Sequence, residues 1–313
     1  MKDNETVCAV VVTYNRKELL IECLDALLKQ TRPVDAIYLI DNASTDGTPE
    51  LLKETGFIKK LPPRELIEPW EKELVIDNKF IIFYVRMHEN TGGAGGFYEG
   101  VKRAYEKGYD WLWLMDDDVE AYDKALENLL KHKNLSKCIQ PNRSLLNKEE
   151  FYWDGFFDIV TMNRIDLYDY NLKNKDFTFV NIGCFEGMLI HRDIINKIGF
   201  PDKRFFINYD DTVYGLKASQ YTNVLLTKKI LMNKKIKKNN LSEFSAYYLL
   251  RNIFLVKKIL DEMFPITKKQ RSFYFNIKLL ILIRAIIREI KFPNSFFVIK
   301  KALIDGIRKK FYK

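Results

Sequence analysis

The segment Trp111–Asp118, WLWLMDDD, joins five apolar residues directly to three aspartates. A continuous apolar run is typical of a strand that is covered on both faces in a parallel sheet. Three adjacent carboxylates at its end repel one another unless a cation lies among them. Hard cations such as Mg²⁺ and Mn²⁺ prefer oxygen ligands and often bridge to substrate phosphates. The segment therefore predicts a buried strand that ends at a metal site for a nucleotide-linked substrate.

Helix capping is the alternative interpretation of the aspartate triplet. Asp116 or Asp118 could accept a backbone N–H at the start of a helix over residues 122–132. One aspartate suffices for a cap, so three in succession favour the metal site.

The residues before this segment alternate between strand and helix patterns. We expect strands over residues 7–12, 36–40 and 80–85, and helices over residues 17–30 and 97–107. Residues 44–49 predict a turn and a helix start. Residues 57–78 contain three prolines and are expected to form a loop insertion with short helical pieces. This alternation predicts an α/β sheet, whose ligands bind at the carboxyl ends of the strands.

After residue 134 the pattern changes to short aromatic segments, which favour a mixed or antiparallel region. We expect strands over residues 151–153, 158–162, 177–181 and 224–226, and helices over residues 193–198 and 215–221. From Ser242 the chain is expected to be helical, with breaks at Pro265 and Pro293.

The composition is that of a globular protein of 313 residues, with 47% hydrophobic and 30% charged residues. Four cysteines without a CxxC pair indicate reduced thiols in a cytoplasmic protein. Only three histidines are present, which argues against a zinc site or a histidine-dependent hydrolase. No signal peptide is expected, and the best apolar run, residues 277–290, is too short and too charged to span a bilayer.

The positive charge is concentrated near the end of the sequence. Residues 266–313 contain 13 Lys and Arg but 2 acidic residues, against a net charge of +9 for the whole chain. Residues 276–290 and 296–310 have apolar residues at helical spacing, so an anionic membrane surface fits this segment better than nucleic acid does. The alternative is a helical pair that packs on its own domain or on a second subunit as a homo-oligomer.

Three further motifs follow predicted strands or begin helices. Asp41 ends a strand, where a carboxylate can bind a base or ribose, although it could simply terminate that strand. Four glycines in residues 92–96 would let backbone N–H groups approach an anion or sugar, or would form a flexible turn. Asp210 and Asp211 form a carboxylate pair, in which one member can act as a general base or as a helix cap.

Five motifs in this order resemble those of family 2 glycosyltransferases, which are inverting enzymes of the GT-A fold. They are VVVTYNR at residues 10–16, IDNASTDGT at 40–48, NTGGAGGF at 90–97, DDD at 116–118 and FINYDD at 206–211. The glycine motif looks like that of the galactofuranosyltransferase branch, which uses UDP-galactofuranose. The neighbouring branch uses dTDP-rhamnose, and YYLLRN at 247–252 resembles a segment of both.

The resemblance implies a fold and a domain organisation. The fold is α/β, with a mixed Rossmann-like sheet flanked by helices and followed by a C-terminal helical region. Residues 1–240 would form the transferase domain, in which 1–120 bind the nucleotide sugar and 121–240 the acceptor. Residues 241–313 would form the basic amphipathic helical region.

The resemblance also assigns roles to single residues. Donor binding falls to Thr13, Asn15, Arg16, Asp41, Asn90, Gly92, Gly93, Gly95, Gly96, Asp116 and Asp117. Asp118, with Asp116, would hold Mg²⁺ or Mn²⁺. Asp211 would be the catalytic base, with Asp210 beside it to orient the acceptor.

Two positions depart from the pattern of the branch. Tyr209 stands where the branch commonly has tryptophan, and Met232 and Asn233 stand where a histidine is expected. If that histidine binds metal, Asn233, water or fewer ligands must serve here, and metal binding should be weaker.

These inferences predict a metal-dependent inverting transferase on the inner face of the cell membrane. It would extend a glycan or glycolipid of a capsule, O-antigen or cell wall. The alternatives are a dTDP-rhamnose-dependent transferase, a catalytically silent sugar-nucleotide-binding protein and a nucleotidyltransferase that releases pyrophosphate.

Overall fold

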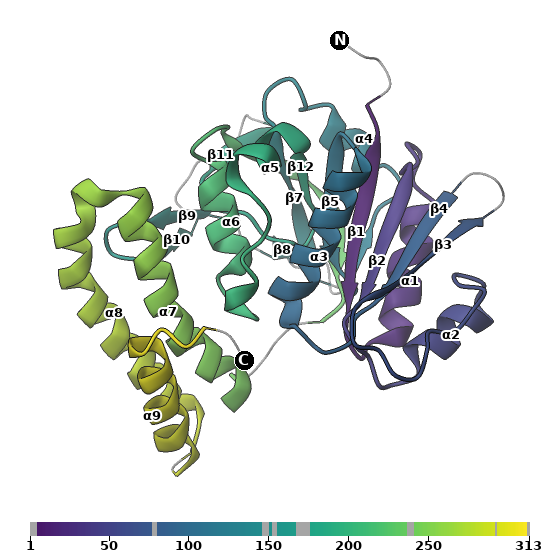
Figure 1. Ribbon diagram of the computed structural model, residues 1–313. Coiled ribbons are helices and arrows are strands. Elements are labelled where there is room, and N and C mark those ends of the chain that lie inside the picture. Colours follow the sequence, from purple (N-terminus) through teal and green to yellow (C-terminus); the bar gives the residue numbers. More distant parts are fainter. Residues whose placement is uncertain are drawn as a thin grey trace.

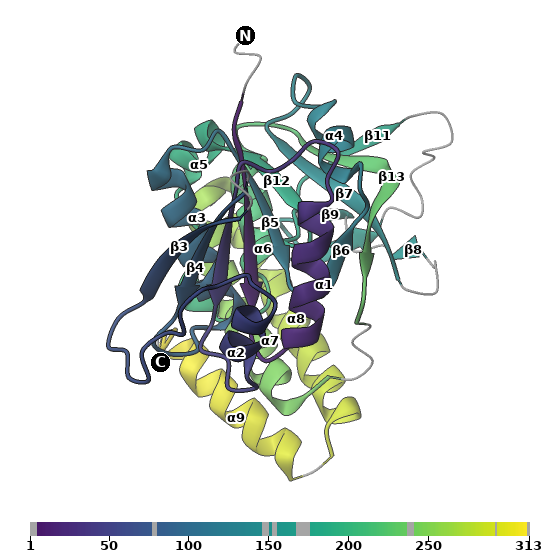
Figure 2. The same cartoon turned by 90° about the vertical axis from the view of Figure 1, so that its right-hand side faces the viewer.

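A mixed β-sheet flanked by helices forms the body of the protein, and three long helices lie beside it (Figures 1 and 2). The computed structural model describes residues 5–76, 80–145, 150–151, 155–166, 176–236, 241–291 and 293–311. Within them, the order of the main sheet is β11-β13-β7-β12-β5-β1-β2-β4-β3, with β6 beside β13 and β8 beside β7. The fold is therefore the predicted α/β arrangement.

The first half of the sheet is parallel. Its strands are β1 (Val7–Thr13), β2 (Ala36–Asp41), β4 (Phe80–Arg86) and β5 (Trp111–Asp116). β1 pairs with β2 and β5 in parallel, with Thr13 opposite Asp41 and Val12 opposite Asp116. The carboxyl ends of three strands thus meet at one edge, as the strand–helix alternation predicted.

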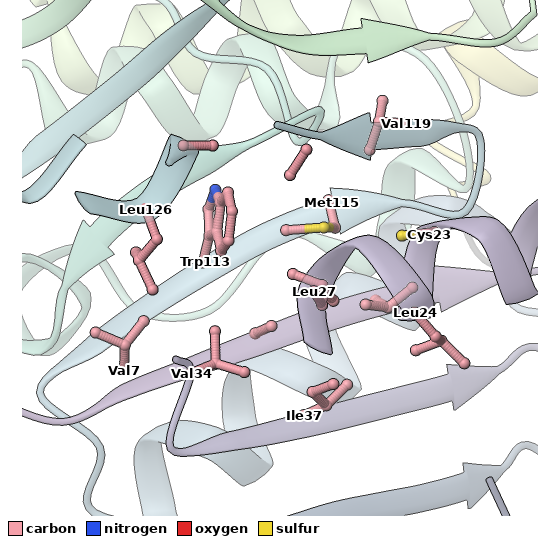
Figure 3. Close-up of a cluster of buried hydrophobic side chains, with 14 of the residues drawn as sticks. Val7, Cys23, Leu24, Leu27, Val34, Ile37, Trp113, Met115, Val119 and Leu126 are labelled. Atoms are coloured by element: carbon pink, nitrogen blue, oxygen red, sulfur yellow. The ribbon is translucent and has the colours of Figure 1, made fainter. Parts of the chain in front are cut away.

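The central strand β5 is buried on both faces. Trp113 and Met115 pack in one cluster with Leu24 and Leu27 of α1 (Lys17–Leu28), as Figure 3 shows. Leu112 and Leu114 of the same strand belong to a second cluster on the opposite face, with residues of α3 (Gly92–Lys107). The apolar run before the aspartates is therefore explained by two helical layers.

The prediction of a loop insertion over residues 57–78 is wrong in its second half. β3 (Trp70–Ile76) pairs antiparallel with β4 at the edge of the sheet, and residues 57–69 contain no helix. The side chains of Glu71, Lys72 and Glu73 are partly or fully exposed. Charged residues are common on edge strands, where they oppose aggregation, and they hid the strand pattern here.

The second half of the sheet is mixed, as expected. Its strands are β6 (Val119–Ala121), β7 (Cys138–Leu145), β8 (Glu150–Phe151), β11 (Phe177–Val180), β12 (Met188–His191) and β13 (Val224–Lys234). β12 is antiparallel to β5 and β7, and β13 is parallel to β7. The strand predicted over 151–153 is described only at Phe151, because 152–154 lie outside the described residues.

Two predicted strands have different bounds. Residues 158–162 were expected to be a strand, but only Asp158 lies in one, as the last residue of β9 (Gly155–Asp158). Residues 159–162 form the turn to β10 (Asn163–Asp166), where the Asp158 carboxylate accepts from the N–H groups of Val160 and Thr161. The strand predicted over 224–226 continues to Lys234 past shifts in register after Leu226. The polar residues 227–229 mark this irregularity, and they interrupt the apolar pattern.

Several helices begin earlier or later than the pattern predicted. α3 begins at Gly92 rather than Phe97, so the glycines form its first turn, and α6 (Asp210–Ala218) begins at Asp210 rather than Gly215. α4 (Ala125–Leu130) has Lys124 as its N-cap residue. The aspartate triplet therefore caps no helix, which removes the capping alternative. The short helices α2 (Thr48–Glu54) and α5 (Arg192–Ile198) agree with the prediction.

The C-terminal region is helical, as predicted. It consists of α7 (Glu243–Met263), α8 (Lys268–Glu289) and α9 (Asn294–Ile307), with Pro265 and Pro293 between them. These helices share a third apolar cluster with residues of α6. None of the helices in the described residues is both long and apolar enough to cross a membrane.

Candidate active site

Three carboxylates gather at the carboxyl end of β5. One oxygen from each of Asp116, Asp118 and Glu186 lies within 4.8 Å of the others. Asp118 is buried, and its Oδ1 accepts no hydrogen bond from the described residues. An unbonded carboxylate oxygen among other oxygen ligands fits a hard divalent cation. The triplet thus supplies two members of a metal-compatible cluster.

Glu186 is the member that the sequence did not reveal. It precedes β12, which runs antiparallel to β5 with Met188 opposite Leu114. The Gly187 N–H donates to the Leu114 carbonyl oxygen over 2.8 Å, so the turn before β12 meets the end of β5. An isolated glutamate in CFEGM has no local signal, and only the pairing of these strands identifies it.

Lys234 brings a positive charge into this cluster. Its ammonium forms an ion pair with Glu186, and its Nζ lies 3.6 Å from Asp118 Oδ1. Burial alone lowers the pKa of Lys234, but Glu186, Asp118 and Asp116 together raise it above its ordinary value. The side chain is therefore a protonated ammonium among the carboxylates.

The carboxamide of Asn233 is bonded elsewhere. Its Oδ1 accepts from the Tyr122 hydroxyl at 2.8 Å and from Ser144 Oγ at 2.6 Å. Successive side chains of a strand point to opposite faces, so Asn233 and Lys234 diverge. Asn233, at the position where we expected a histidine, therefore does not contribute to the acidic cluster, whereas its neighbour Lys234 does.

Asp117 connects the triplet to the end of β1. Its carboxylate accepts from Thr13 Oγ1 at 2.7 Å and pairs with Arg16 Nη1 at 2.9 Å. The same guanidinium lies 3.2 Å from Asp118. Burial raises the pKa of Asp117, and the charge of Arg16 offsets part of that increase. Three predicted donor-binding residues are therefore in direct contact.

The end of β2 forms a second bonded group. Asp41 is fully buried and accepts from the Tyr84 hydroxyl at 2.7 Å, from Arg86 at 2.5 Å and from the Ser44 N–H at 2.8 Å. Asn15 Oδ1 accepts from the Thr45 N–H at 2.6 Å. These bonds fix the loops after β1 and β2 against each other at the same edge of the sheet.

Asn90 and the glycines fix the start of α3. Asn42 Nδ2 donates to Asn90 Oδ1 at 3.1 Å and to the Gly92 carbonyl oxygen at 2.9 Å. The φ angle of Gly92 is +72°, and a Cβ there would overlap the carbonyl oxygen of Phe206. The Ala94 N–H donates to that oxygen over 3.0 Å. The first turn of α3 therefore braces the loop that leads to Asp210.

The other glycines differ in the space around them. A Cβ on Gly95 would overlap Thr91, and one on Gly96 would lie 2.5 Å from Cγ1 of Val12. A Cβ on Gly93 would have no neighbour within 4 Å. Close packing thus explains three of the four glycines, and Gly93 is the one beside open space.

The loop before Asp210 has a strained backbone, and α7 stabilises it through hydrogen bonds. Phe206, Asn208 and Tyr209 have φ angles of 65°, 66° and 69°, a region that costs energy for residues other than glycine. The buried Asn252 donates to the carbonyl oxygens of three residues, Phe205, Ile207 and Asn208. Such bonds over-determine the loop geometry, and they give the YYLLRN segment a structural role.

Asp211 lies in the first turn of α6, within electrostatic reach of Glu186. Removal of its carboxyl from water raises its pKa to about 6, although hydrogen bonds from Thr212 and Cys184 oppose the shift. The negative charge of Glu186 raises the pKa further, which links Asp211 electrostatically to the metal-compatible cluster. A carboxylate with a pKa near neutrality is suited to accept a proton from a hydroxyl.

The chain is similar to proteins of known sequence and structure. Residues 8–199 match the family model for glycosyl transferase family 2. Galactofuranosyltransferase GlfT1 of Mycobacterium tuberculosis H37Rv is 35% identical over 214 residues, which are 66% of this chain and 62% of GlfT1. The chain thus spans less than two thirds of the length of the GlfT1 relatives that it matches.

Two solved structures share the fold. TarS 1–349 of S. aureus in complex with UDP-GlcNAc has a TM-score of 0.58 at 14% identity and covers 98% of this chain and 82% of TarS 1–349. Mannosyltransferase PcManGT of Pyrobaculum calidifontis, in complex with GDP-Man and Mn²⁺, has a TM-score of 0.56 at 14% identity and covers 99% and 83%. With its GT-A arrangement of sheet and helices and its match over residues 8–199, the chain belongs to glycosyl transferase family 2.

Proposed function

We propose that the protein is a metal-dependent inverting glycosyltransferase that adds galactofuranose from UDP-galactofuranose to a lipid-linked cell-surface glycan. The observation that carries this proposal is the gathering of Asp116, Asp118 and Glu186, beside which Asp211 has a raised pKa to which the charge of Glu186 contributes. Oxygen ligands for a cation and a carboxylate of raised pKa are the groups that such a transfer requires.

The reaction can be assigned to residues of this chain. Asp116, Asp118 and Glu186 would hold Mg²⁺ or Mn²⁺, which when bound neutralises charge on the leaving diphosphate. Asp211 takes the proton from an acceptor hydroxyl, whose oxygen attacks the anomeric carbon while the bond to the diphosphate oxygen breaks. A single displacement inverts that carbon. Asp210, next in the chain, would orient the acceptor.

The donor assignment rests on sequence similarity. The residues at 13–16 and 41, and those at 90–96, lie at the edge of the sheet where a nucleotide would bind. The relative GlfT1 is named a galactofuranosyltransferase, which favours UDP-galactofuranose over dTDP-rhamnose. In this proposal residues 1–120 bind the donor, and residues 121–240 bind the acceptor.

The C-terminal helices would bring the enzyme to its acceptor. α8 and α9 carry a series of lysines and arginines and also expose large apolar side chains. The exposed apolar residues are Phe273, Ile277, Leu280, Ile281, Ile287, Phe296, Phe297 and Ile307. This pattern suits a helix that lies in the interface of an anionic bilayer. We therefore place the protein as a peripheral enzyme on the inner face of the membrane.

An assay of UDP release tests the catalytic assignment. With Mn²⁺ and UDP-galactofuranose, Asp211→Asn should lower the rate by a factor on the order of 10² to 10⁴, because the general base is lost. UDP binding by this variant should stay within a few-fold of the unmodified protein. Asp25→Asn, which changes an exposed carboxylate on α1, is the matched control and should keep full activity.

Other outcomes would contradict parts of the proposal. Consumption of dTDP-rhamnose with UDP-galactofuranose untouched would make the donor assignment wrong. Release of pyrophosphate would identify a nucleotidyltransferase. No release from any sugar nucleotide, together with measurable UDP binding, would identify a catalytically silent binding protein.

A further inference from the structure

Lys234 occupies the position of a cation in the acidic cluster. Its side chain is 9% exposed, and its ammonium pairs with Glu186 and lies 3.6 Å from Asp118 Oδ1. These are two of the three carboxylates that would hold a metal ion. A buried lysine is rare unless it is paired, and here Glu186 and Asp118, which pair with it, are candidate metal ligands.

The backbone fixes Lys234 at this place. Lys234 is paired with Val119 of β6 on one side and with Leu145 of β7 on the other. The N–H of the next residue donates to the Asp118 carbonyl oxygen over 2.8 Å. Only the flexible side chain can therefore move the ammonium away from the carboxylates.

A divalent cation and this ammonium have overlapping requirements. Mg²⁺ binds carboxylate oxygens at about 2.0–2.1 Å, so a cation shared by Asp118 and Glu186 would lie within a few ångströms of the present Nζ. Two positive charges at that separation repel each other, and each prefers the same oxygens. Binding of a divalent cation at the cluster therefore opposes the presence of the Lys234 ammonium there, and the reverse also holds.

We propose that Lys234 is a built-in counter-ion that competes with the divalent cation for Glu186 and Asp118. This inference rests on the proposed metal site. Without metal, the ammonium balances the carboxylates and keeps the cluster assembled. Metal binding displaces the ammonium from Glu186, so the affinity of the free protein for metal is low.

Direct measurement of Mn²⁺ binding tests the competition without any turnover. In a titration of the metal-free, donor-free protein, followed by the electron paramagnetic resonance of free Mn²⁺, Lys234→Met should bind at least tenfold more tightly than the unmodified protein. Its melting temperature without metal should fall, because Glu186 and Asp118 lose the positive charge of Lys234, although Arg16 remains beside Asp118. Added Mn²⁺ should raise that temperature more than it does in the unmodified protein.

Neighbouring and conservative variants provide the controls. Lys235→Met removes the adjacent ammonium, which pairs with Glu22 at 3.0 Å and Glu120 at 2.5 Å, and should leave Mn²⁺ affinity unchanged. Lys234→Arg keeps the charge and should bind Mn²⁺ weakly. Should Lys234→Met not fold, Lys234→Gln replaces it in the same titration.

The possible failures are distinguishable. Equal Mn²⁺ affinity in the unmodified protein and in the neutral variants at position 234 would overturn the competition and leave the metal site intact. Tight binding by Lys234→Arg would overturn it as well, since the charge would then not matter. No Mn²⁺ binding by any variant, at concentrations that support UDP release, would overturn both the competition and the proposed ligand set.

Discussion

Asp211, the proposed proton acceptor, is the residue whose role is easiest to test against pH. Because the folded protein raises the pKa of Asp211 to about 6, this carboxyl is mostly protonated below that pH and cannot act as a base. We expect kcat/KM for UDP release to fall about tenfold per pH unit below pH 6, where a single protonation removes the active form. An aspartate of ordinary pKa would keep its activity to about pH 4.

The measurement is a pH profile of kcat/KM between pH 4.5 and 8 at fixed ionic strength. A parallel circular dichroism measurement at each pH separates loss of the base from unfolding. A profile that stays flat down to pH 5 in folded protein would contradict the role of Asp211 as the titrating base.

At the same scale, the sequence predicted the residues that lie within motifs and missed those that arrive from distant strands. Asp116, Asp118 and Asp211 belong to short sequence motifs, DDD and FINYDD, that can be recognised without a structure. Glu186 joins them only because β12 pairs antiparallel with β5. Lys234 joins them only because β13 resumes its pairing after an irregularity. Neither pairing leaves a local trace in the sequence.

Among the elements, α3 begins with a glycine that the fold requires, Gly92, followed by one that alanine can replace, Gly93. Gly92→Ala should lower the free energy of unfolding by about 2 kcal/mol or more, because a Cβ would overlap the Phe206 backbone and the φ angle of +72° disfavours alanine. Gly93→Ala meets no neighbour and should raise stability by up to about 1 kcal/mol, since alanine favours helix.

Urea unfolding of the two variants, without metal or nucleotide, provides the comparison. The adjacent positions share one helical turn, so the pair controls for helix propensity and for distance from the site. Equal stabilities for the two variants would show that the close approach of α3 to Phe206 does not constrain the fold.

Sequence patterns predict best those elements that meet the same environment on both faces. β5 is covered on both faces, and its apolar run was sufficient to identify it. β3 lies at an edge with charged side chains in the solvent, so its pattern predicts a loop instead of a strand. The early starts of α3 and α6 were missed because glycines and aspartates are typical of loops, whereas here tertiary contacts extend each helix through them.

At the scale of the whole molecule, the β-sheet body and the basic helices are joined through α7. Asn252 and Arg251 of α7 donate to backbone carbonyl oxygens in the 204–208 segment, just before Asp210. The same helix packs in one apolar cluster with residues of α8 and α9. One helix, α7, thus contacts both the outer helices and the loop that precedes the proposed base.

The outer helices yield the last prediction, which is binding to anionic vesicles. Phe296 and Phe297 of α9 are 52% and 63% exposed, and transfer of each exposed phenyl surface into a bilayer contributes on the order of 1 kcal/mol. The double variant Phe296→Ser, Phe297→Ser should therefore bind vesicles containing phosphatidylglycerol about tenfold or more weakly in a flotation assay. Added salt should weaken binding of the unmodified protein, because its lysines and arginines attract the anionic surface. Ile67→Ser, at a 95% exposed position of the sheet domain, should bind as the unmodified protein does. If the unmodified protein instead ignores vesicles and sediments as a dimer that the double variant dissociates, this surface is a subunit interface, and the enzyme meets its acceptor in another way.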